Sequence, residues 1–339
     1  MSESRRGTVR VAGIDLGSNT TRLHVADVGR AEDGSMSLKT ISRHSTVTRL
    51  AEQVDARGIL LPQAIARTRN ALADYRRILR DEGAVFALVG ATSAVRDADN
   101  GESFLGEVEY TYGFRTELLS GSDEAHTGFR GVTSDATLWE RTRTGSSMSI
   151  DIGGGSTEFV LAHDGAIVDH ESLQLGSVRI TERFLDGHDP HRPDDVLRAV
   201  QYVADTLAAR FPAAAHPDVA IGVAGTVTTV ASFALGLETY DPRRTHLASV
   251  PATRVSAEVV RLSRMTIAER ELVPCLEPKR APVIVGGLII LECAMRHFGV
   301  TSLTASERDI LDGIALRAGE IAIDEGISEL PEPFGRTNC

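Results

Sequence analysis

The fold is decided by residues 148–160, which read Met-Ser-Ile-Asp-Ile-Gly-Gly-Gly-Ser-Thr-Glu-Phe-Val. An apolar run ends at Ile152, as a buried strand would, and a second apolar run begins after the turn at residues 153–155. Glycines in such a turn let a ligand approach the backbone N–H groups. Asp151 and Glu158 flank the turn, and two carboxylates beside a phosphate cradle indicate a cation between them. The stretch therefore predicts a metal–phosphate site.

The same pattern occurs earlier in the chain. Residues 14–20, Ile-Asp-Leu-Gly-Ser-Asn-Thr, align with residues 150–156, Ile-Asp-Ile-Gly-Gly-Gly-Ser. Each segment is a strand, an Asp-x-Gly step, a small polar turn and a returning strand. A repeat this long indicates two related α/β domains, and ligands usually bind in the cleft between such domains. We expect a first domain over residues 8–130 and a second over residues 145–305.

The remaining elements agree with two α/β halves. In the first half, a helix is predicted over residues 62–82 and a buried strand over residues 84–90. In the second half, a helix with one apolar face is predicted over residues 193–211, before a buried strand over residues 219–223. Helices and strands that alternate in this way are typical of α/β domains.

The two ends of the chain are predicted to lie outside these domains. Residues 1–7 and 326–339 are polar, and the latter are also rich in proline, so we expect both to be flexible. A last helix over residues 306–323 is expected to pack back on the first domain.

The composition limits the classes of protein that the chain can belong to. The 339 residues are 42% hydrophobic and 24% charged, as in a soluble globular protein. A formal net charge of -11 argues against general nucleic-acid binding, although a local arginine cluster can still bind a polyanion. Neither a membrane span nor an apolar signal core is visible, so we expect a cytoplasmic protein without membrane partners. The three cysteines are far apart and predict neither a disulfide framework nor a zinc site.

The two glycine turns are the predicted phosphate cradle. Either turn alone could be a simple hairpin, but the repetition favours a cradle of N–H groups and hydroxyls. The chain has no Walker sequence, and a strand rather than a helix follows residues 153–155, so a Rossmann fingerprint is also excluded. The predicted phosphate-binding residues in these turns are Gly17, Ser18, Asn19, Gly153, Gly154, Gly155 and Ser156.

Two strand ends in the first half carry further candidates. Ser93 and Arg96 follow a buried strand, and the fork of Arg96 matches phosphate oxygens, although a surface arginine at a helix start is the alternative. Glu124 follows the strand near residues 115–119, where open α/β sheets place their chemistry. The alternative for this segment is helix capping with Ser122 as the N-cap, and Glu124 could be a general base in addition.

Other residues give weaker signals. Arg22, Arg43 and Arg49 lie in segments that could line the same cleft, but we expect a surface role for each. Residues 225–229, Gly-Thr-Val-Thr-Thr, follow a buried strand of the second half. They are either a tight turn into a helix or the second-half counterpart of the strand-end site.

The predicted metal ligands are the acidic residues of the two turns. Glu158 is either a solvated strand carboxylate or a group that holds the ion or the attacking water. Because Asp151 is so close in sequence, we favour the second role, with Asp151 and Glu158 as ligands. Asp15, at the matching position of the first half, is a further candidate.

Taken together, these motifs resemble the exopolyphosphatase / guanosine pentaphosphate phosphohydrolase (Ppx/GppA) family. Five motifs occur in the order of that family over about 215 residues, and the Gly-Gly-Gly-Ser-Thr-Glu segment is the most specific. The matching segments are residues 13–20, 91–100, 120–125, 150–158 and 224–226, and residues 306–313 also fit.

The resemblance implies a duplicated actin-like (ribonuclease H-like) ATPase fold, with two domains and an interdomain cleft. It implies a hydrolase that removes the terminal phosphate of inorganic polyphosphate, with the 5′-phosphate of guanosine pentaphosphate as the alternative substrate. It further implies Mg²⁺ or Mn²⁺, a homodimer, and a link to guanosine penta- and tetraphosphate in the stringent response. In the family pattern Glu124 is the catalytic base, and Asp151 and Glu158 serve the metal and the water.

Two departures from the family pattern affect these expectations. The family often has Glu-Glu-Ala where this chain has Asp123-Glu124-Ala125, but the second acid, the expected base, is intact. Longer relatives carry a helical C-terminal extension that this sequence lacks, so we expect a preference for shorter polyphosphate chains.

Two rival functions compete with hydrolysis. A kinase or ATPase of the same fold would need an acceptor pocket and usually an aspartate base, and the sequence indicates neither. A non-catalytic sensor of polyphosphate or alarmones would gain nothing from the three negative charges of Glu124, Asp151 and Glu158.

Overall fold

The computed structural model describes residues 7–212 and 216–332, which form two α/β units. The first unit comprises residues 7–135 and 310–332, and the second comprises the described residues between 136 and 309. The last helix therefore belongs to the first unit although it follows the second in sequence.

The first unit is built on a five-stranded sheet with the order β3-β2-β1-β4-β5. Its first three strands are antiparallel, whereas β4 runs parallel to β1 and β5 runs parallel to β4. The strands are β1 (Thr8–Leu16), β2 (Thr20–Arg30), β3 (Met36–Val47), β4 (Phe86–Ala91) and β5 (Arg115–Leu118).

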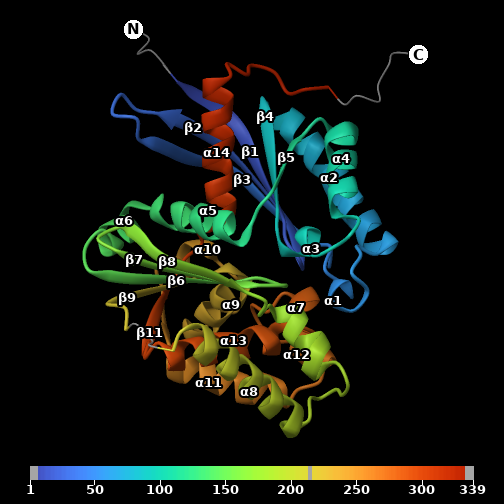
Figure 1. Ribbon diagram of the computed structural model, residues 1–339, viewed down its shortest axis with the longest axis vertical. Helices are drawn as coiled ribbons and strands as arrows, with labels where there is room; N and C mark the ends of the chain where they lie inside the picture. Colours follow the sequence, from blue (N-terminus) through green and yellow to red (C-terminus); the bar gives the residue numbers. More distant parts are fainter. Residues whose placement is uncertain (1–6, 213–215, 333–339) are drawn as a thin grey trace. The chain divides into compact units, whose positions relative to one another are not determined.

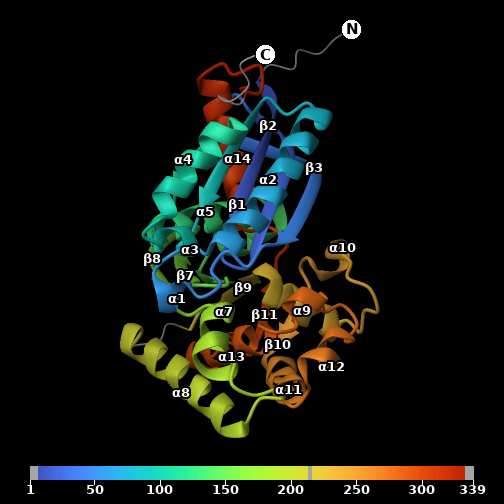
Figure 2. The ribbon, with the colours of Figure 1, turned by 90° about the vertical axis from the view of Figure 1, so that its right-hand side faces the viewer.

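Helices cover both faces of this sheet (Figures 1 and 2). Because side chains alternate along a strand, Ile14 of β1 is buried on the face of α2 and α4, and Val11 is buried on the face of α14. Gly13 also lies on the α14 face, where a Cβ atom would stand 2.7 Å from the backbone nitrogen of Ala315. The helices are α1 (Val54–Arg57), α2 (Pro62–Glu82), α3 (Ser93–Arg96), α4 (Gly101–Tyr112), α5 (Gly121–Thr133) and α14 (Ile310–Asp324).

The second unit is built on a six-stranded sheet with the order β10-β11-β9-β6-β7-β8. Strands β6, β7 and β8 are antiparallel, β9 runs parallel to β6, and β11 runs parallel to β9. The strands are β6 (Ser146–Ile152), β7 (Thr157–His163), β8 (Ala166–Leu173), β9 (Val219–Val223), β10 (Ser249–Pro251) and β11 (Ser302–Ala305).

The two sheets share one topology. Each starts with three antiparallel strands and continues with two strands that run parallel to the first, and β10 is an addition at one edge of the second sheet. This shared order confirms the predicted duplicated actin-like (ribonuclease H-like) fold. It also places Asp15 and Asp151 near the ends of the equivalent strands β1 and β6.

The second unit has its apolar core on one face of its sheet. Ile150 and Ile152 of β6 are buried there, together with Leu288 and Leu291 of α13. Residues 177–185 form a short α-helix followed by a π-helix. The helices are α6 (Ala136–Thr142), α7 (Ser177–Ile180), the π-helix (Thr181–Leu185), α8 (Pro193–Arg210), α9 (Ala224–Ala234), α10 (Pro242–Thr245), α11 (Ala252–Ser263), α12 (Ile267–Glu271), a 3₁₀ helix (Pro278–Arg280) and α13 (Ile284–His297).

Part of the predicted flexible C-terminal end is packed. Ile327 and Leu330 contact apolar clusters of the first unit, and Arg76 donates from Nη2 to the carbonyl of Pro331 at 2.5 Å. Apolar contacts and a hydrogen bond from the Arg76 side chain thus hold a segment that composition alone indicated to be loose. The other expected flexible positions, residues 1–6 and 333–339, lie outside the described residues.

Candidate functional site

The first-unit turn, residues 17–19, is held by its carbonyl groups. Ser18 accepts from the backbone N–H of Ala51 at 2.9 Å, and Asn19 accepts from two N–H groups of residues 48–49 at 3.1 and 2.9 Å. In the part of the chain that the structure describes, the N–H groups of Ser18 and Asn19 donate to no protein acceptor. The turn therefore offers N–H groups to a ligand, as a phosphate cradle requires.

The structure brings two predicted phosphate-binding serines together. The hydroxyls of Ser18 and Ser93 share a hydrogen bond of 3.0 Å, and both side chains are buried. The pairing of β1 with β4 explains this contact, because Ser18 follows β1 and Ser93 begins α3, the helix after β4. Sequence spacing alone could not place these residues, 75 positions apart, in contact.

Arg96 and Glu124 also meet within the first unit. Arg96 donates from Nη1 to Oε1 of Glu124 in a short ion pair, and the same Nη1 donates to the carbonyl of Leu119 at 2.7 Å. The side chain of Glu124 is 4% exposed, whereas that of Arg96 is 24% exposed. Arg96 therefore contacts the predicted base directly, and its expected role as a phosphate ligand stays a prediction.

The start of α5 explains how Glu124 is oriented. The predicted N-cap, Ser122, is wrong: the N-cap is Ser120, which forms a capping box with Asp123. Ser120 Oγ accepts from the N–H of Asp123 at 3.1 Å, and the Asp123 carboxylate accepts from the hydroxyl and N–H of Ser120 at 2.6 and 3.0 Å. These hydrogen bonds hold the pKa of Asp123 below its ordinary value. Asp123 thus serves the helix end, and the next residue, Glu124, faces Arg96.

Asp15 has a basic partner in the first unit. It is the cross-strand partner of Arg22, which donates from Nε at 3.0 Å and from Nη2 at 2.8 Å to Oδ2 of Asp15. This ion pair balances the charge of Asp15, so that a metal ion is not needed for that purpose. Arg43 lies at the surface as expected, and it also forms an ion pair with the fully buried Asp312 of α14.

In the second unit, Asp151 and Glu158 are direct cross-strand partners on β6 and β7. Their side chains therefore share one face of the sheet, opposite the face on which Ile150 is buried. Glu158 is 7% exposed and is in turn the cross-strand partner of Ser172 on β8, whose Oγ donates to Oε1 of Glu158 at 2.8 Å. Glu158 is thus buried and oriented, and the alternative of a solvated strand carboxylate is excluded.

The second-unit turn, residues 153–156, is closed by a hydrogen bond of 3.0 Å from the N–H of Gly153 to the carbonyl of Ser156. All three glycine carbonyls accept hydrogen bonds from residues 177–179, which sequence analysis had not singled out. Among the described residues, the N–H groups of positions 154–156 donate to no protein acceptor. The bonds to the carbonyls are Ser177 N to Gly153 O at 2.9 Å, Ser177 Oγ to Gly153 O at 3.2 Å, Val178 N to Gly154 O at 2.9 Å, Arg179 N to Gly154 O at 3.2 Å and Arg179 Nε to Gly155 O at 2.9 Å.

The acidic pair fits a hard divalent cation. In the described ranges no group of three or more His, Cys, Asp or Glu side chains is arranged to enclose a metal ion. Mg²⁺ does not require such a cage, because it keeps several waters and is usually bound by one or two carboxylates together with substrate phosphates. Adjacent carboxylates at Asp151 and Glu158, beside a turn with available N–H groups, match this donor set.

The strand-end segment of the second unit is a close-packed turn. A Cβ atom on Gly225 would stand 1.6 Å from Nη1 of Arg280, so the guanidinium of Arg280 lies directly over this glycine. Ala224, before it, has a φ of 65°. A side chain at position 225 would therefore have to displace the guanidinium of Arg280, and neither of the two expected roles of the segment is tested by this contact.

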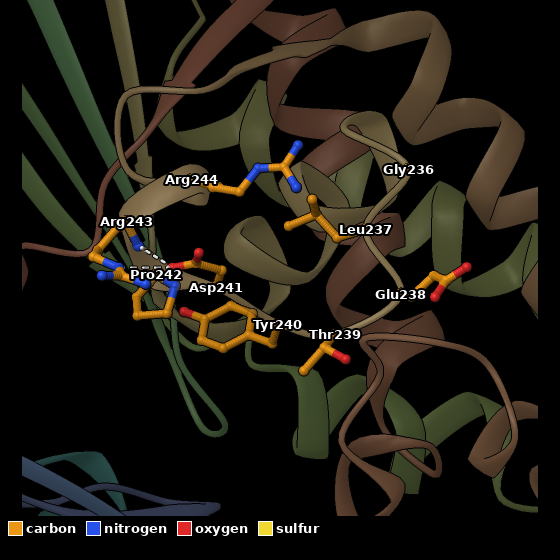
Figure 3. A pocket seen from close by; sticks show the side chains of 9 residues that line it. All are labelled: Gly236, Leu237, Glu238, Thr239, Tyr240, Asp241, Pro242, Arg243 and Arg244. Atoms are coloured by element: carbon orange, nitrogen blue, oxygen red, sulfur yellow. Dashed lines mark hydrogen bonds and ion pairs between the residues drawn. The ribbon is translucent and has the colours of Figure 1, made fainter.

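A pocket of about 860 Å³ opens elsewhere in the second unit, lined by residues 236–244 (Figure 3). Tyr240 donates to the carboxylate of Glu307 at 2.6 Å, and burial together with that charge raises the pKa of Tyr240. The lining residues include none of the predicted phosphate or metal ligands. The pocket is thus separate from the residues that carry the predicted chemistry.

Comparisons with known proteins agree on one family. The model of the Ppx/GppA phosphatase family matches residues 28–319. Exopolyphosphatase 2 of Mycobacterium tuberculosis is 37% identical over 319 residues, which cover 91% of this chain and 98% of that protein.

No helix in the described ranges has the length and hydropathy needed to cross a membrane.

Solved structures give the same result. A protein described as exopolyphosphatase-like is 31% identical, with a TM-score of 0.83 over 92% of this chain and 99% of its own. The Ppx/GppA family member of Aquifex aeolicus is 26% identical, with a TM-score of 0.74 over 96% of this chain and 100% of its own. Both similarities extend over the two units described above.

Proposed function

The chain belongs to the Ppx/GppA phosphatase family, and we propose that it is an exopolyphosphatase that hydrolyses the terminal phosphate of inorganic polyphosphate with the help of Mg²⁺ or Mn²⁺. The observation that carries the substrate is the 37% identity to Exopolyphosphatase 2 over almost the full length of both chains. The geometry supports the proposal, because each unit presents a turn with available N–H groups and a buried carboxylate that is held by a hydrogen bond.

In the first unit, we assign the proton transfer to Glu124. Hydrolysis of a phosphoric anhydride needs a water that attacks in line with the leaving oxygen, and a carboxylate that is already ionised can accept the proton of that water. Arg96 holds the carboxylate through its ion pair. The N–H groups of Ser18 and Asn19, with the hydroxyl of Ser93, are suited to phosphate oxygens.

In the second unit, we assign the cation to Asp151 and Glu158, and phosphate oxygens to the N–H groups of residues 154–156. When bound, the cation supplies neutralisation of the charge that develops on the phosphate oxygens. Oxygen ligands of this kind suit Mg²⁺ and Mn²⁺ alike. Asp15 is a weaker candidate, since Arg22 already balances its charge.

Guanosine pentaphosphate is the second candidate substrate, because the family unites both activities in its name. Its 5′-terminal phosphate is also a phosphoric anhydride, so the same carboxylates and N–H groups could act on it. The expected homodimer and the link to the stringent response stay predictions.

A substrate panel tests the proposed function. Phosphate release is measured from polyphosphate, guanosine pentaphosphate and ATP, side by side and with Mg²⁺. The proposal expects the highest kcat/KM with polyphosphate. A preference for guanosine pentaphosphate would select the alternative, a preference for ATP would indicate an ATPase, and binding of polyphosphate without turnover would indicate a sensor.

A further inference from the structure

A short segment of the second unit contacts both chemical parts of the proposed site. This segment, residues 172–179, runs from the end of β8 into α7, and we call it the backing segment. Its first residue, Ser172, donates to Oε1 of Glu158 at 2.8 Å. Since β7 lies between β6 and β8, Ser172 reaches this carboxylate from the side opposite Asp151.

The other end of the backing segment holds the glycine turn. Arg179 binds two successive carbonyls of the turn, that of Gly154 through its backbone N–H at 3.2 Å and that of Gly155 through Nε at 2.9 Å. The approach is so close that a Cβ atom on Gly176 would stand 2.1 Å from the oxygen of Gly154. The turn is thus packed directly against the segment.

Fixing the carbonyls also fixes the N–H groups of the turn. A trans peptide is planar, so the C=O of one residue and the N–H of the next point in opposite directions. Hydrogen bonds to the carbonyls of residues 153–155 therefore turn the N–H groups of residues 154–156 away from the backing segment. These are the N–H groups that have no protein acceptor among the described residues.

We propose that Ser172 and Arg179 are positioning residues for the phosphatase reaction. Ser172 orients the carboxylate of Glu158 toward the cation, and Arg179 orients the peptide groups of the glycine turn toward the phosphate. The inference rests on the proposed function, which assigns the cation and the phosphate to these groups. Neither side chain needs to touch substrate or metal to act in this way.

The role proposed for Arg179 predicts that removing its side chain weakens phosphate binding. In Arg179→Ala the carbonyl of Gly155 loses its charged donor, so the N–H group of Ser156, in the same peptide, loses its fixed direction. The bonds to the carbonyls of Gly153 and Gly154 remain. We expect KM for tripolyphosphate to rise about tenfold with kcat changed less than about threefold, since ground-state and transition-state phosphates are held alike. Arg183→Ala is the matched control, because Arg183 lies in the next turn of the chain and contacts Tyr202 instead.

The role proposed for Ser172 predicts that removing its hydroxyl weakens metal binding, which can be measured without substrate. Groups that hydrogen-bond a metal ligand typically change metal affinity by about 10- to 100-fold when they are removed. We expect Ser172→Ala to weaken Mn²⁺ binding about tenfold in an electron paramagnetic resonance titration, and Ser172→Thr to restore it. Ser249→Ala is the control, because the hydroxyl of Ser249 bonds only to that of Ser302 among the described residues.

The outcomes separate this inference from the proposed function. A wild-type chain that does not hydrolyse tripolyphosphate would reject the proposed function. The inference alone would be overturned by a different result. In that case the wild type is active, the KM of Arg179→Ala lies within about twofold of wild type, and so does the Mn²⁺ affinity of Ser172→Ala. If thermal unfolding shows that Arg179→Ala does not fold, Arg179→Lys carries the same test, because it keeps the charge and loses the fork.

Discussion

Arg96 and Glu124 form a short ion pair in which one guanidinium nitrogen of Arg96, Nη1, also donates to the carbonyl of Leu119 at 2.7 Å. Glu124 lies in the first turn of α5, and Arg96 ends the short helix after β4. The proposed base is therefore held from a second element of the same unit. Its position depends on Arg96 as well as on its own helix.

Replacing Glu124 by Gln tests the base. The amide keeps the shape and can still accept from Arg96, but it cannot take a proton from water. We expect kcat for phosphate release from tripolyphosphate to fall about 10²- to 10⁴-fold, the usual contribution of a general base. Steady-state assays give kcat, and thermal unfolding shows whether the variant is folded. Near-normal turnover in a folded variant would remove Glu124 as the base.

Removing Arg96 leaves Glu124 buried without this charged partner. We expect Arg96→Ala to lower the free energy of unfolding by about 1–3 kcal/mol, in the range for a buried charged group that loses a hydrogen bond, and to reduce kcat as well. Arg96→Lys keeps the charge, so we expect its free energy of unfolding to lie between those of wild type and Arg96→Ala. Urea unfolding measures the stability. A wild-type free energy of unfolding in Arg96→Ala would show that the ion pair does not support Glu124.

The capping box makes one contribution to stability depend on pH. Hydrogen bonds from Ser120 lower the pKa of Asp123 in the folded state, so its contribution is present above the ordinary aspartate pKa of about 3.9 and is lost as pH falls through the lowered value. We expect Asp123→Asn to be less stable than wild type at pH 7, with a smaller difference at pH 3. Urea unfolding at both pH values measures the difference in stability between wild type and Asp123→Asn. An equal difference at pH 7 and pH 3 would show that the ionised carboxylate of Asp123 does not stabilise the folded state.

Gly176 is predicted to tolerate no side chain. Because its Cβ would stand 2.1 Å from the oxygen of Gly154, Gly176→Ala must displace the glycine turn. We expect a loss of about 1–3 kcal/mol in stability and a higher KM for tripolyphosphate. Gly187→Ala is the matched control, since no heavy atom lies within 4 Å of a Cβ built there. Equal KM values for the two variants would show that the contact has no functional effect.

Much of the fold could be predicted because the repeat is local in sequence. The Asp-x-Gly steps at Asp15 and Asp151 identify equivalent strands, and the structure gives both sheets the same order. The helix over Pro62–Glu82 was also predictable, because proline begins it and Gly83, with a φ of 73°, ends it. The short elements α10 and β10, of 4 and 3 residues, lack a periodic pattern and were missed.

The candidate site was predicted as a set of residues but not as a set of contacts. The pattern Ser-x-x-Asp, typical of a capping box, identifies Ser120 as the N-cap, so the expectation of Ser122 misses a signal that the sequence contains. The contacts of Arg96 with Glu124 and of Ser172 with Glu158 join different elements, so they follow from strand register and packing. Local patterns do not contain that information.

The central claim, removal of terminal phosphate with a divalent cation, is tested most directly by the first products formed from tetrapolyphosphate. An exopolyphosphatase converts it with water to tripolyphosphate and orthophosphate, whereas cleavage in the middle gives two pyrophosphates. Phosphorus NMR of a single time course distinguishes these products. We predict equimolar tripolyphosphate and orthophosphate at early times with Mg²⁺, and no reaction after chelation of the metal. Pyrophosphate as the first product, or undiminished hydrolysis without a divalent cation, would contradict the account.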